Sequence, residues 1–228
     1  MADQGVAGAG AAKFLPRLIA AFEGIPLTEG EGEAEHPLIP TAAFAAACEP
    51  LLDAFQLMGS VFSWAQTDFE QKRHSVADAA AELPSLQSIV EKGRKDKTLA
   101  VKNSVGRNLH RLKCGVHFIV ALLERLCSSS EVTMHEAAGE AYAKTLQPIH
   151  NWAVQAAVQA SLLTCPSRQY FLQSINETDQ SAAELALRFA KVADPVVAAV
   201  DALFADDIPP PSSSWTNIAG GGWGWGSS

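Results

Sequence analysis

Features that mark membrane-spanning, secreted or disulfide-bonded proteins are missing from this sequence of 228 residues. It has no run of about 18 uncharged apolar residues, so we expect no transmembrane helix. The opening residues MADQGVAGAGAAKFL lack a basic segment followed by an apolar run, so we expect no secretory signal. The cysteines lie far apart without a CxxC pair, which predicts reduced thiols in a cytosolic protein: Cys48, Cys114, Cys127 and Cys165.

The signatures of most enzyme classes are missing too. We find no Gly-rich phosphate loop, no GxSxG sequence, no cluster of metal ligands and no regularly spaced Cys/His pair. The sequence therefore predicts a protein that is not an enzyme and that holds no metal or cofactor. A net charge of −8 argues against a general nucleic-acid binder. Residues 92–113 do hold eight Lys or Arg and one acid, but they lack the aromatic side chains on which bases stack.

Strand-forming patterns are nearly absent, and Gly and Pro fall between segments of helical periodicity. Pro50 is expected to kink the second helix and Thr133 to cap the fifth. Residues 208–228 are rich in Gly, Ser and Trp, and we predict that this tail is disordered. Residues 1–207 are predicted to form one domain of about eight packed helices, at residues 14–22, 41–76, 84–97, 98–127, 133–146, 148–164, 168–174 and 181–204.

Two arginines end an apolar face of the helix predicted at residues 98–127. Arg107 and Arg111 lie four residues apart, and their face continues with Cys114, Phe118 and Leu122. Fixed guanidiniums beside an apolar surface suit an anion with a hydrophobic tail. The opposite face carries an ordinary core stripe, formed by Val105, Leu109, Leu112, Val116, Ile119 and Leu123.

The helix predicted at residues 41–76 has the same arrangement in reverse. Asp68 and Lys72 lie four residues apart, and Trp64, Val61 and Leu57 precede them on the same face. Such pairs usually do no more than solvate a surface. If the two helices pack antiparallel, however, the polar pairs meet at one end of a shared apolar slot. This predicts a headgroup site above a hydrophobic pocket.

These segments resemble the glycolipid transfer protein family, over about residues 14–205. The resemblance implies an all-α fold, a two-layer sandwich of eight helices that encloses a lipid in a hydrophobic pocket. It is carried by TDFEQK with Asp68 and Lys72, by GRNLHRLKCG with Arg107 and Arg111, and by AYAKTLQPIHNW with His150 and Trp152.

Two positions divide that family. Glycolipid-specific members carry Asn where Lys72 stands and Trp where Arg111 stands, and an amide and an indole suit a sugar. With two cations there, the sequence is similar to the ceramide-1-phosphate branch, and within it to the plant accelerated-cell-death type. The resemblance implies that Lys72, Arg107 and Arg111 hold the phosphate and that Asp68 accepts from the ceramide amide N–H and a sphingoid hydroxyl.

The resemblance further implies that His150 donates to the acyl amide oxygen or assists with the phosphate, and that Trp152 contacts membranes. Cys114 departs from the family pattern, because many members have Arg there. The chain therefore has one positive charge fewer at the edge of the site. The apolar stripes are expected to line the pocket together with Phe44, Phe55, Phe62 and Leu163.

The function implied is that of a monomeric carrier that takes ceramide-1-phosphate from membranes by transient contact and moves it through the cytosol. A carrier is needed because hydrocarbon chains are unfavourable in water. Burying each methylene away from water stabilises the lipid by about 0.8 kcal/mol. Two alternatives stay open, a sphingolipid sensor or adaptor with little transfer activity and a glycosphingolipid transfer protein. We expect no nucleic acid among its partners.

Overall fold

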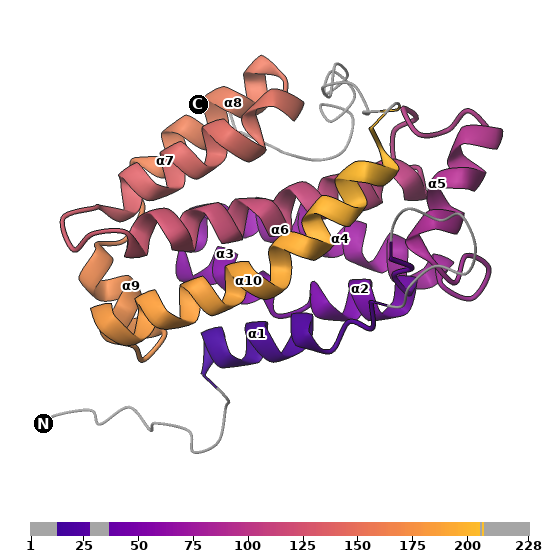
Figure 1. Cartoon of the computed structure of the whole chain (residues 1–228). Helices are drawn as coiled ribbons and strands as arrows, with labels where there is room; N and C mark the ends of the chain where they lie inside the picture. The colour runs from indigo at the N-terminus through magenta and orange to yellow at the C-terminus, as the bar shows by residue number, and fades with distance from the viewer. Residues whose placement is uncertain (1–12, 28–36, 206, 208–228) are drawn as a thin grey trace, which may run out of the picture.

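The computed structural model describes residues 13–27, 37–205 and 207, most of which lie in helices (Figure 1). No strand occurs within these ranges, where one isolated bridge joins Pro40 to Ser85. The all-helical class is therefore as predicted, whereas the tail at residues 208–228 lies outside the described residues. The helices are α1 (Phe14–Glu23), α2 (Thr41–Ala47), α3 (Leu51–Leu57), η1 (Ser60–Phe62), α4 (Ser63–Ala79), α5 (Leu86–Lys95), α6 (Val105–Cys127), α7 (Met134–Thr145), η2 (Gln147–Ile149), α8 (Trp152–Leu162), α9 (Arg168–Ser174) and α10 (Asp179–Leu203).

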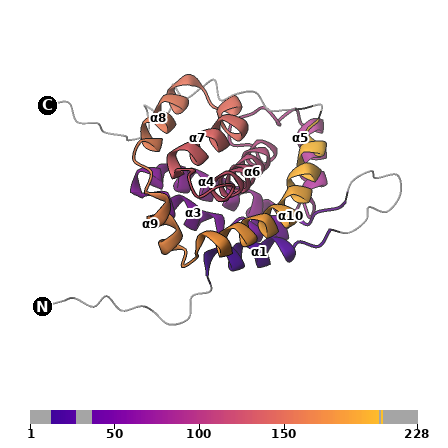
Figure 2. The same ribbon diagram turned by 60° about the vertical axis from the view of Figure 1, so that its left-hand side comes forward.

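Helix α6 runs through the middle of the molecule with the other helices around it (Figures 1 and 2). It packs against α10, α7, α4 and α5, and most of its residues are buried. Helix α1 covers α10, where the rings of Phe22 and Phe189 meet edge to face with centroids 5.3 Å apart. Because the middle of α6 is almost fully buried, Arg111 must face either protein or a pocket. Among the helices in the described ranges, none is long and apolar enough to cross a bilayer.

The single helix predicted at residues 41–76 is wrong, because the chain forms α2, α3, η1 and α4 there. Pro50 stands at the N-cap of α3, since a proline ring cannot continue the preceding helix. Gly59 has a φ of 116°, a left-handed conformation that favours glycine, and it separates α3 from η1. The kink at Pro50 was expected. The break at Gly59 was not, and it changes the faces on which the preceding residues lie.

The helix predicted at residues 98–127 begins only at Val105, after the N-cap Ser104. The preceding loop contains two residues with left-handed backbone, Lys97 with a φ of 56° and Asn103 with a φ of 63°. Leu99 packs from this loop against Gly93 of α5 and Gly106 of α6, so closely that a Cβ at either glycine would collide with it. The two glycines thus allow the loop to join α5 to the start of α6.

Other helix ends follow the capping signals in the sequence. Thr133 caps α7 in a capping box with Glu136, as predicted, and α9 has the predicted bounds. The helix predicted at residues 148–164 is shorter, because Pro148 lies in the 3₁₀ turn η2 and Asn151 caps a new helix at Trp152. The last helix starts two residues before the predicted position, after its cap Thr178.

Helices α4 and α6 pack antiparallel, as the sequence argument required. Near the end of α4, Ser75 Oγ accepts a hydrogen bond of 2.9 Å from the Asn108 amide near the start of α6. Further along, Gly115 of α6 lies against the ring of Phe69, which precedes Ser75 on α4. Rising residue numbers on one helix therefore match falling numbers on the other. The two polar pairs come to the same end of the contact.

Candidate functional site

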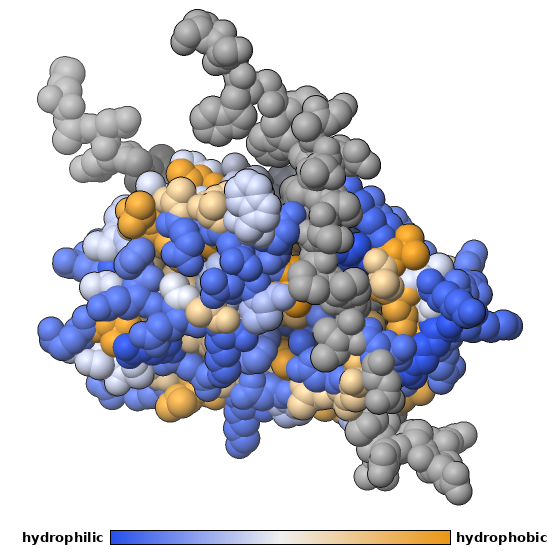
Figure 3. Space-filling view, turned by 90° about the horizontal axis from the view of Figure 1, so that it is seen from above, coloured by the Kyte–Doolittle hydropathy of each residue, from blue (hydrophilic) through white to orange (hydrophobic). Residues whose placement is uncertain are grey.

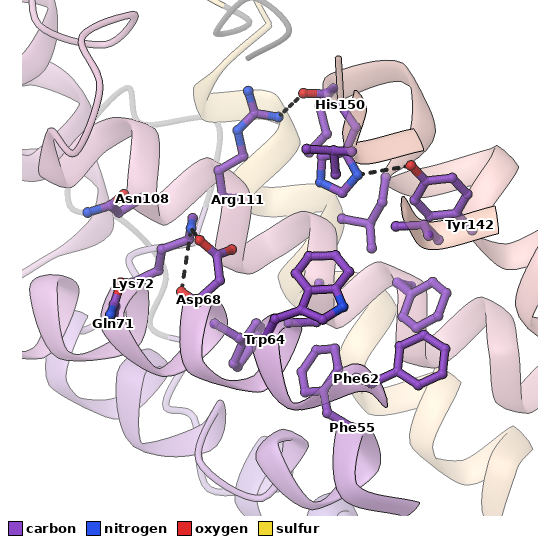
Figure 4. A pocket seen from close by; sticks show the side chains of 18 of the residues that line it. Phe55, Phe62, Trp64, Asp68, Gln71, Lys72, Asn108, Arg111, Tyr142 and His150 are labelled. Atoms are coloured by element: carbon purple, nitrogen blue, oxygen red, sulfur yellow. Dashed lines mark hydrogen bonds and ion pairs between the residues drawn. The ribbon is translucent and has the colours of Figure 1, made fainter. Parts of the chain in front are cut away.

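A cavity of about 340 Å³ opens between α4 and α6, with α3, η1, α7, η2 and α8 completing its wall (Figure 4). Its size falls within the range of small-molecule sites, which is about 300–1,000 Å³. Charged and amide side chains gather at one end of this cavity. The remaining lining is apolar: Phe55, Met58, Phe62, Trp64, Ala65, Phe69, Phe118, Leu146, Ile149, Val154, Val158 and Leu162.

The polar end contains all five headgroup residues proposed from the sequence. Asp68 and Lys72 come from α4, Arg107 and Arg111 come from α6, and His150 follows η2. The Lys72 ammonium pairs with the Asp68 carboxylate one turn away and lies 3.4 Å from the Asp68 carbonyl oxygen. Three cations and one carboxylate therefore share this end of the cavity.

Arg111 is the most enclosed of these cations, with only 8% of the residue exposed. Its Nη1 donates a 3.0 Å hydrogen bond to the Ile149 carbonyl in η2 (Figure 4). Burial, together with the positive charge of Arg107, lowers the pKa of its guanidinium to about 10. Arg111 thus stays charged at neutral pH but is destabilised by its surroundings, which an incoming anion would relieve.

Arg107 is less buried than Arg111. Its Nη1 donates to the Ala100 carbonyl at 3.2 Å, which ties it to the loop before α6. Burial lowers the pKa of this guanidinium also. Lys102 and Asn103 of that loop line the cavity beside it. The loop therefore adds a fourth cation, Lys102, that periodicity could not find because it lies outside a helix.

His150 is held against Tyr142 of α7. The Tyr142 hydroxyl lies 3.1 Å from His150 Nδ1, and the two ring centroids are 5.7 Å apart. Burial lowers the pKa of His150 to about 4, with a second contribution from the charge of Arg111. His150 is therefore neutral at physiological pH. Tyr142 was missed in the sequence, because it lies in α7 whereas His150 follows η2, and helical periodicity does not relate side chains of different elements.

Several of the apolar positions expected to line the pocket lie elsewhere. Phe55 and Phe62 line it, as predicted, but Phe44 is buried in the core away from the cavity, and Leu163 is 77% exposed. Val61 is also exposed. The break at Gly59 interrupts the helix, so Val61 no longer lies on the same face as Asp68.

On α6, Phe118 lines the cavity as expected, whereas Cys114 and Leu122 are buried without lining it. One turn after Arg111 the chain presents Gly115 instead, and Gly115 does line the cavity. Phe69 fills the space beside it, since a Cβ at Gly115 would lie 2.6 Å from Phe69 Cε2. Glycine therefore sets how closely α4 and α6 approach at the cavity floor.

Trp152 is the first residue of α8, and 82% of it is exposed. Asn151 fixes this position, since its side-chain oxygen accepts a 2.9 Å hydrogen bond from the Val154 amide and caps the helix. Helix α8 carries no charged side chain. Figure 3 looks onto the molecule from the side of α7 and α8, where apolar and hydrophilic side chains are mixed. An exposed indole is what the membrane prediction for Trp152 requires, and in the chain it stands between His150 and Val154, which both line the cavity.

The described part of the chain offers no group of three or more His, Cys, Asp or Glu side chains that could hold a metal ion. All four cysteines are free thiols, with Cys48 and Cys114 buried and Cys127 and Cys165 partly so. The cavity thus presents cations, one carboxylate, one neutral imidazole and an apolar wall. This set suits binding of an amphiphilic anion.

Comparisons with known proteins agree with this geometry. The family model described as glycolipid transfer protein matches residues 39–177. The ACD11 homolog protein of Arabidopsis thaliana is 29% identical over 163 residues, which cover 72% of this chain and 71% of the relative. Ceramide-1-phosphate transfer protein of Rattus norvegicus is 29% identical over 147 residues, covering 58% and 68%.

Among solved structures, an Asp-to-Asn variant of Arabidopsis ACD11 complexed with C12 ceramide-1-phosphate superposes with a TM-score of 0.78. The superposition covers 86% of this chain and 96% of that one, at 24% identity. The predicted fold class is therefore confirmed.

Proposed function

The chain belongs to the glycolipid transfer protein family, and we propose that within this family it carries ceramide-1-phosphate between membranes. The proposal rests on one observation above all. Lys72, Arg107 and Arg111 line the same end of a cavity whose other walls are largely apolar. A phosphate monoester with long hydrocarbon chains matches both parts of this cavity at once.

The cations account for the phosphate. A phosphate monoester carries up to two negative charges and several acceptor oxygens, and guanidinium groups bind it through charge-assisted hydrogen bonds. Arg111 is buried beside a second cation, so an anion at this place relieves repulsion that water relieves less well. The Lys72–Asp68 pair keeps the carboxylate next to the phosphate position, where it can accept from the ceramide amide and hydroxyl.

The identity of two side chains supports phosphate over sugar. Glycolipid-specific members of the family carry Asn and Trp at the positions of Lys72 and Arg111. An indole provides a flat face for a sugar ring, and two cations do not. The relatives named for ceramide-1-phosphate transfer point to the same branch.

The apolar wall accounts for the chains. At about 0.8 kcal/mol per methylene, a sixteen-carbon chain left in water would cost roughly 12 kcal/mol. Phenylalanines from three elements, Phe55, Phe62 and Phe118, supply much of the lining that could shield such a chain. The same reasoning favours a carrier over an enzyme, because the site holds binding groups and an apolar cover.

We further propose that the carrier acts as a cytosolic monomer that touches membranes only in passing, and that residues 1–207 form the functional domain. Trp152 supports the membrane contact, because its exposed indole favours the headgroup region of a bilayer.

The test is transfer between vesicles. Donor vesicles carry fluorescent ceramide-1-phosphate or fluorescent galactosylceramide, and acceptor vesicles carry neither. We expect transfer of the phosphate lipid and almost none of the sugar lipid, with the lipid recovered chemically unchanged. Comparable rates for the two lipids would contradict the branch assignment. Tight binding in native mass spectra without transfer would favour a sensor instead.

A further inference from the structure

Tyr142 and His150 form a neutral hydrogen-bonded pair at the polar end of the cavity. Tyr142 is 1% exposed, and its hydroxyl lies 3.1 Å from His150 Nδ1. Both residues line the cavity, Tyr142 from α7 and His150 from the segment between η2 and α8. The contact therefore joins a rigid helix to the residue that reaches the ligand position.

The direction of this hydrogen bond follows from the two groups. Burial raises the pKa of Tyr142 to about 12, so its hydroxyl keeps its proton, and burial lowers the pKa of His150 to about 4, so its ring is neutral. Within the described ranges, His150 Nδ1 is the hydrogen-bond partner of that hydroxyl. A buried hydroxyl must place its proton on an acceptor. Tyr142 therefore donates to Nδ1, and the ring proton resides on Nε2.

The other ring nitrogen of His150 faces the side of the cavity where Asp68, Lys72 and Arg111 lie (Figure 4). Building on the proposed function, we infer that Tyr142 is a positioning residue that fixes His150 as a one-way hydrogen-bond donor to the lipid. The ligand atom that meets Nε2–H must then be an acceptor, such as the acyl amide carbonyl oxygen or a phosphate oxygen. A ligand hydroxyl or amine hydrogen at this point is disfavoured.

The backbone that carries His150 is fixed independently of Tyr142. The Gln155 side-chain amide donates to the carbonyls of Gln147 at 3.1 Å and of His150 at 2.8 Å. Arg111 donates to the carbonyl of Ile149 in the same segment. These bonds hold the segment to α8 and α6 but do not touch the imidazole. The tautomer of the imidazole ring therefore depends on the contact with Tyr142.

The first experiment measures the tautomer in the lipid-free protein. Nitrogen NMR shifts of the His150 ring, assigned by their loss in His150→Gln, are recorded for wild type, Tyr142→Phe and Tyr170→Phe. Tyr170 is the exposed matched control. We expect Nε2–H in wild type and in Tyr170→Phe, and a mixture of both tautomers in Tyr142→Phe. Nδ1–H in wild type, or the same tautomer after Tyr142→Phe, overturns the inference.

The second experiment is a double-mutant cycle on ceramide-1-phosphate binding. Loss of one oriented hydrogen bond predicts that Tyr142→Phe weakens binding about five- to tenfold when His150 is present. It should weaken binding less than about twofold in a His150→Gln background, because the two groups act as a unit. Equal effects in both backgrounds mean a purely structural tyrosine and overturn the inference.

The two failures are distinguishable. A wild-type protein that binds no ceramide-1-phosphate would defeat the proposed function, while the tautomer measurement, made without lipid, would still decide the role of Tyr142.

Discussion

Arg111 and Lys113 are two residues apart on α6 and both are buried, yet they face opposite sides of the helix. Lys113 faces α10 and pairs with the carboxylate of Asp201. Arg111 faces the cavity, where it donates to a backbone carbonyl and lies close enough to Arg107 for their charges to repel. Two histidines follow the same division. His110 packs edge to face on Phe204 of the α10 side with centroids 5.2 Å apart, and His150 lines the cavity.

The difference distinguishes a cation whose charge is compensated within the fold from one that we propose binds an anion. A buried ammonium paired with a carboxylate has its charge compensated before any ligand arrives. Guanidiniums grouped beside a cavity keep part of their electrostatic energy for the ligand. Burial of a cation alone is therefore no argument for a binding role, and the proposal for Arg111 rests on its burial beside like charge and an apolar cavity.

The largest expected effect is that of Arg111→Ala. Loss of a partly desolvated charge-assisted contact should weaken ceramide-1-phosphate binding by about 2–4 kcal/mol, or some 30- to 1000-fold. The melting temperature of the lipid-free protein should change by less than about 2 °C, because the repulsion from Arg107 is relieved as a hydrogen bond is lost. Lipid titration and thermal unfolding measure the two quantities.

Lys113→Met is the matched control for that variant. It removes a buried cation from the same helix but from the α10 side. We expect a change in lipid binding below about twofold, together with a small change in stability, because Asp201 is half-exposed and can be solvated. Similar losses of binding in the two variants would contradict the division of α6 into two sides.

The two buried histidines should make stability depend on pH. Burial lowers the pKa of His110 to about 3 and that of His150 to about 4, both below the unfolded value of 6.5. Protonation of the unfolded chain then removes stability as the pH falls from about 6.5 toward 4, and none is lost above 6.5. At pH 5 each histidine should account for about 2 kcal/mol.

Urea unfolding at pH 7 and pH 5 checks this expectation. His110→Gln and His150→Gln should each reduce the difference between the two pH values, and the double variant should retain a smaller difference, since burial also lowers the pKa of His117. Short-chain ceramide-1-phosphate should change the contribution of His150 to this difference and leave the contribution of His110 unchanged. A double variant with the same pH dependence as wild type would assign it to other groups.

A smaller effect is expected for exposed apolar residues on the two sides. Trp152→Ala should lower adsorption to vesicles several-fold and slow transfer without changing the fold, because an indole partitions into the headgroup region. Leu187→Ala on the outer face of α10 is the control, since Leu187 is also exposed. Vesicle co-sedimentation compares them. Equal losses would mean that general hydrophobicity, and not the cavity side, decides adsorption.

The smallest effect is expected at the end of the chain. Asp207 is the last described residue, and its carboxylate forms an ion pair with Arg94 of α5. This ion pair holds the chain after α10 against α5. A chain that ends at Asp207 should bind ceramide-1-phosphate within about twofold of the full chain, because the residues that line the cavity all lie between Phe55 and Leu162. Loss of binding in a titration would show that the tail contributes to the site.

The helical class and the grouping of the two polar pairs at one cavity could be predicted because they depend on short spacings. Pairs four residues apart, Asp68 with Lys72 and Arg107 with Arg111, must share a face of any helix that contains them. Caps such as Thr133 act within one turn. The lining could be predicted less well. The face of Val61 depended on an unbroken helix, and a single glycine with positive φ was enough to turn it outward.

The residue pattern alone establishes that the chain is helical, that two polar pairs end apolar faces, and that these pairs meet if α4 and α6 run antiparallel. The packing of the helices is needed to tell which buried cation faces the cavity, since Arg111 and Lys113 look equivalent until Asp201 of α10 is placed beside one of them. The contact between Tyr142 and His150 likewise appears only once the helices are packed. Periodicity fixes the directions of side chains within one helix, whereas their charge partners and cavities are supplied by helices far away in the sequence.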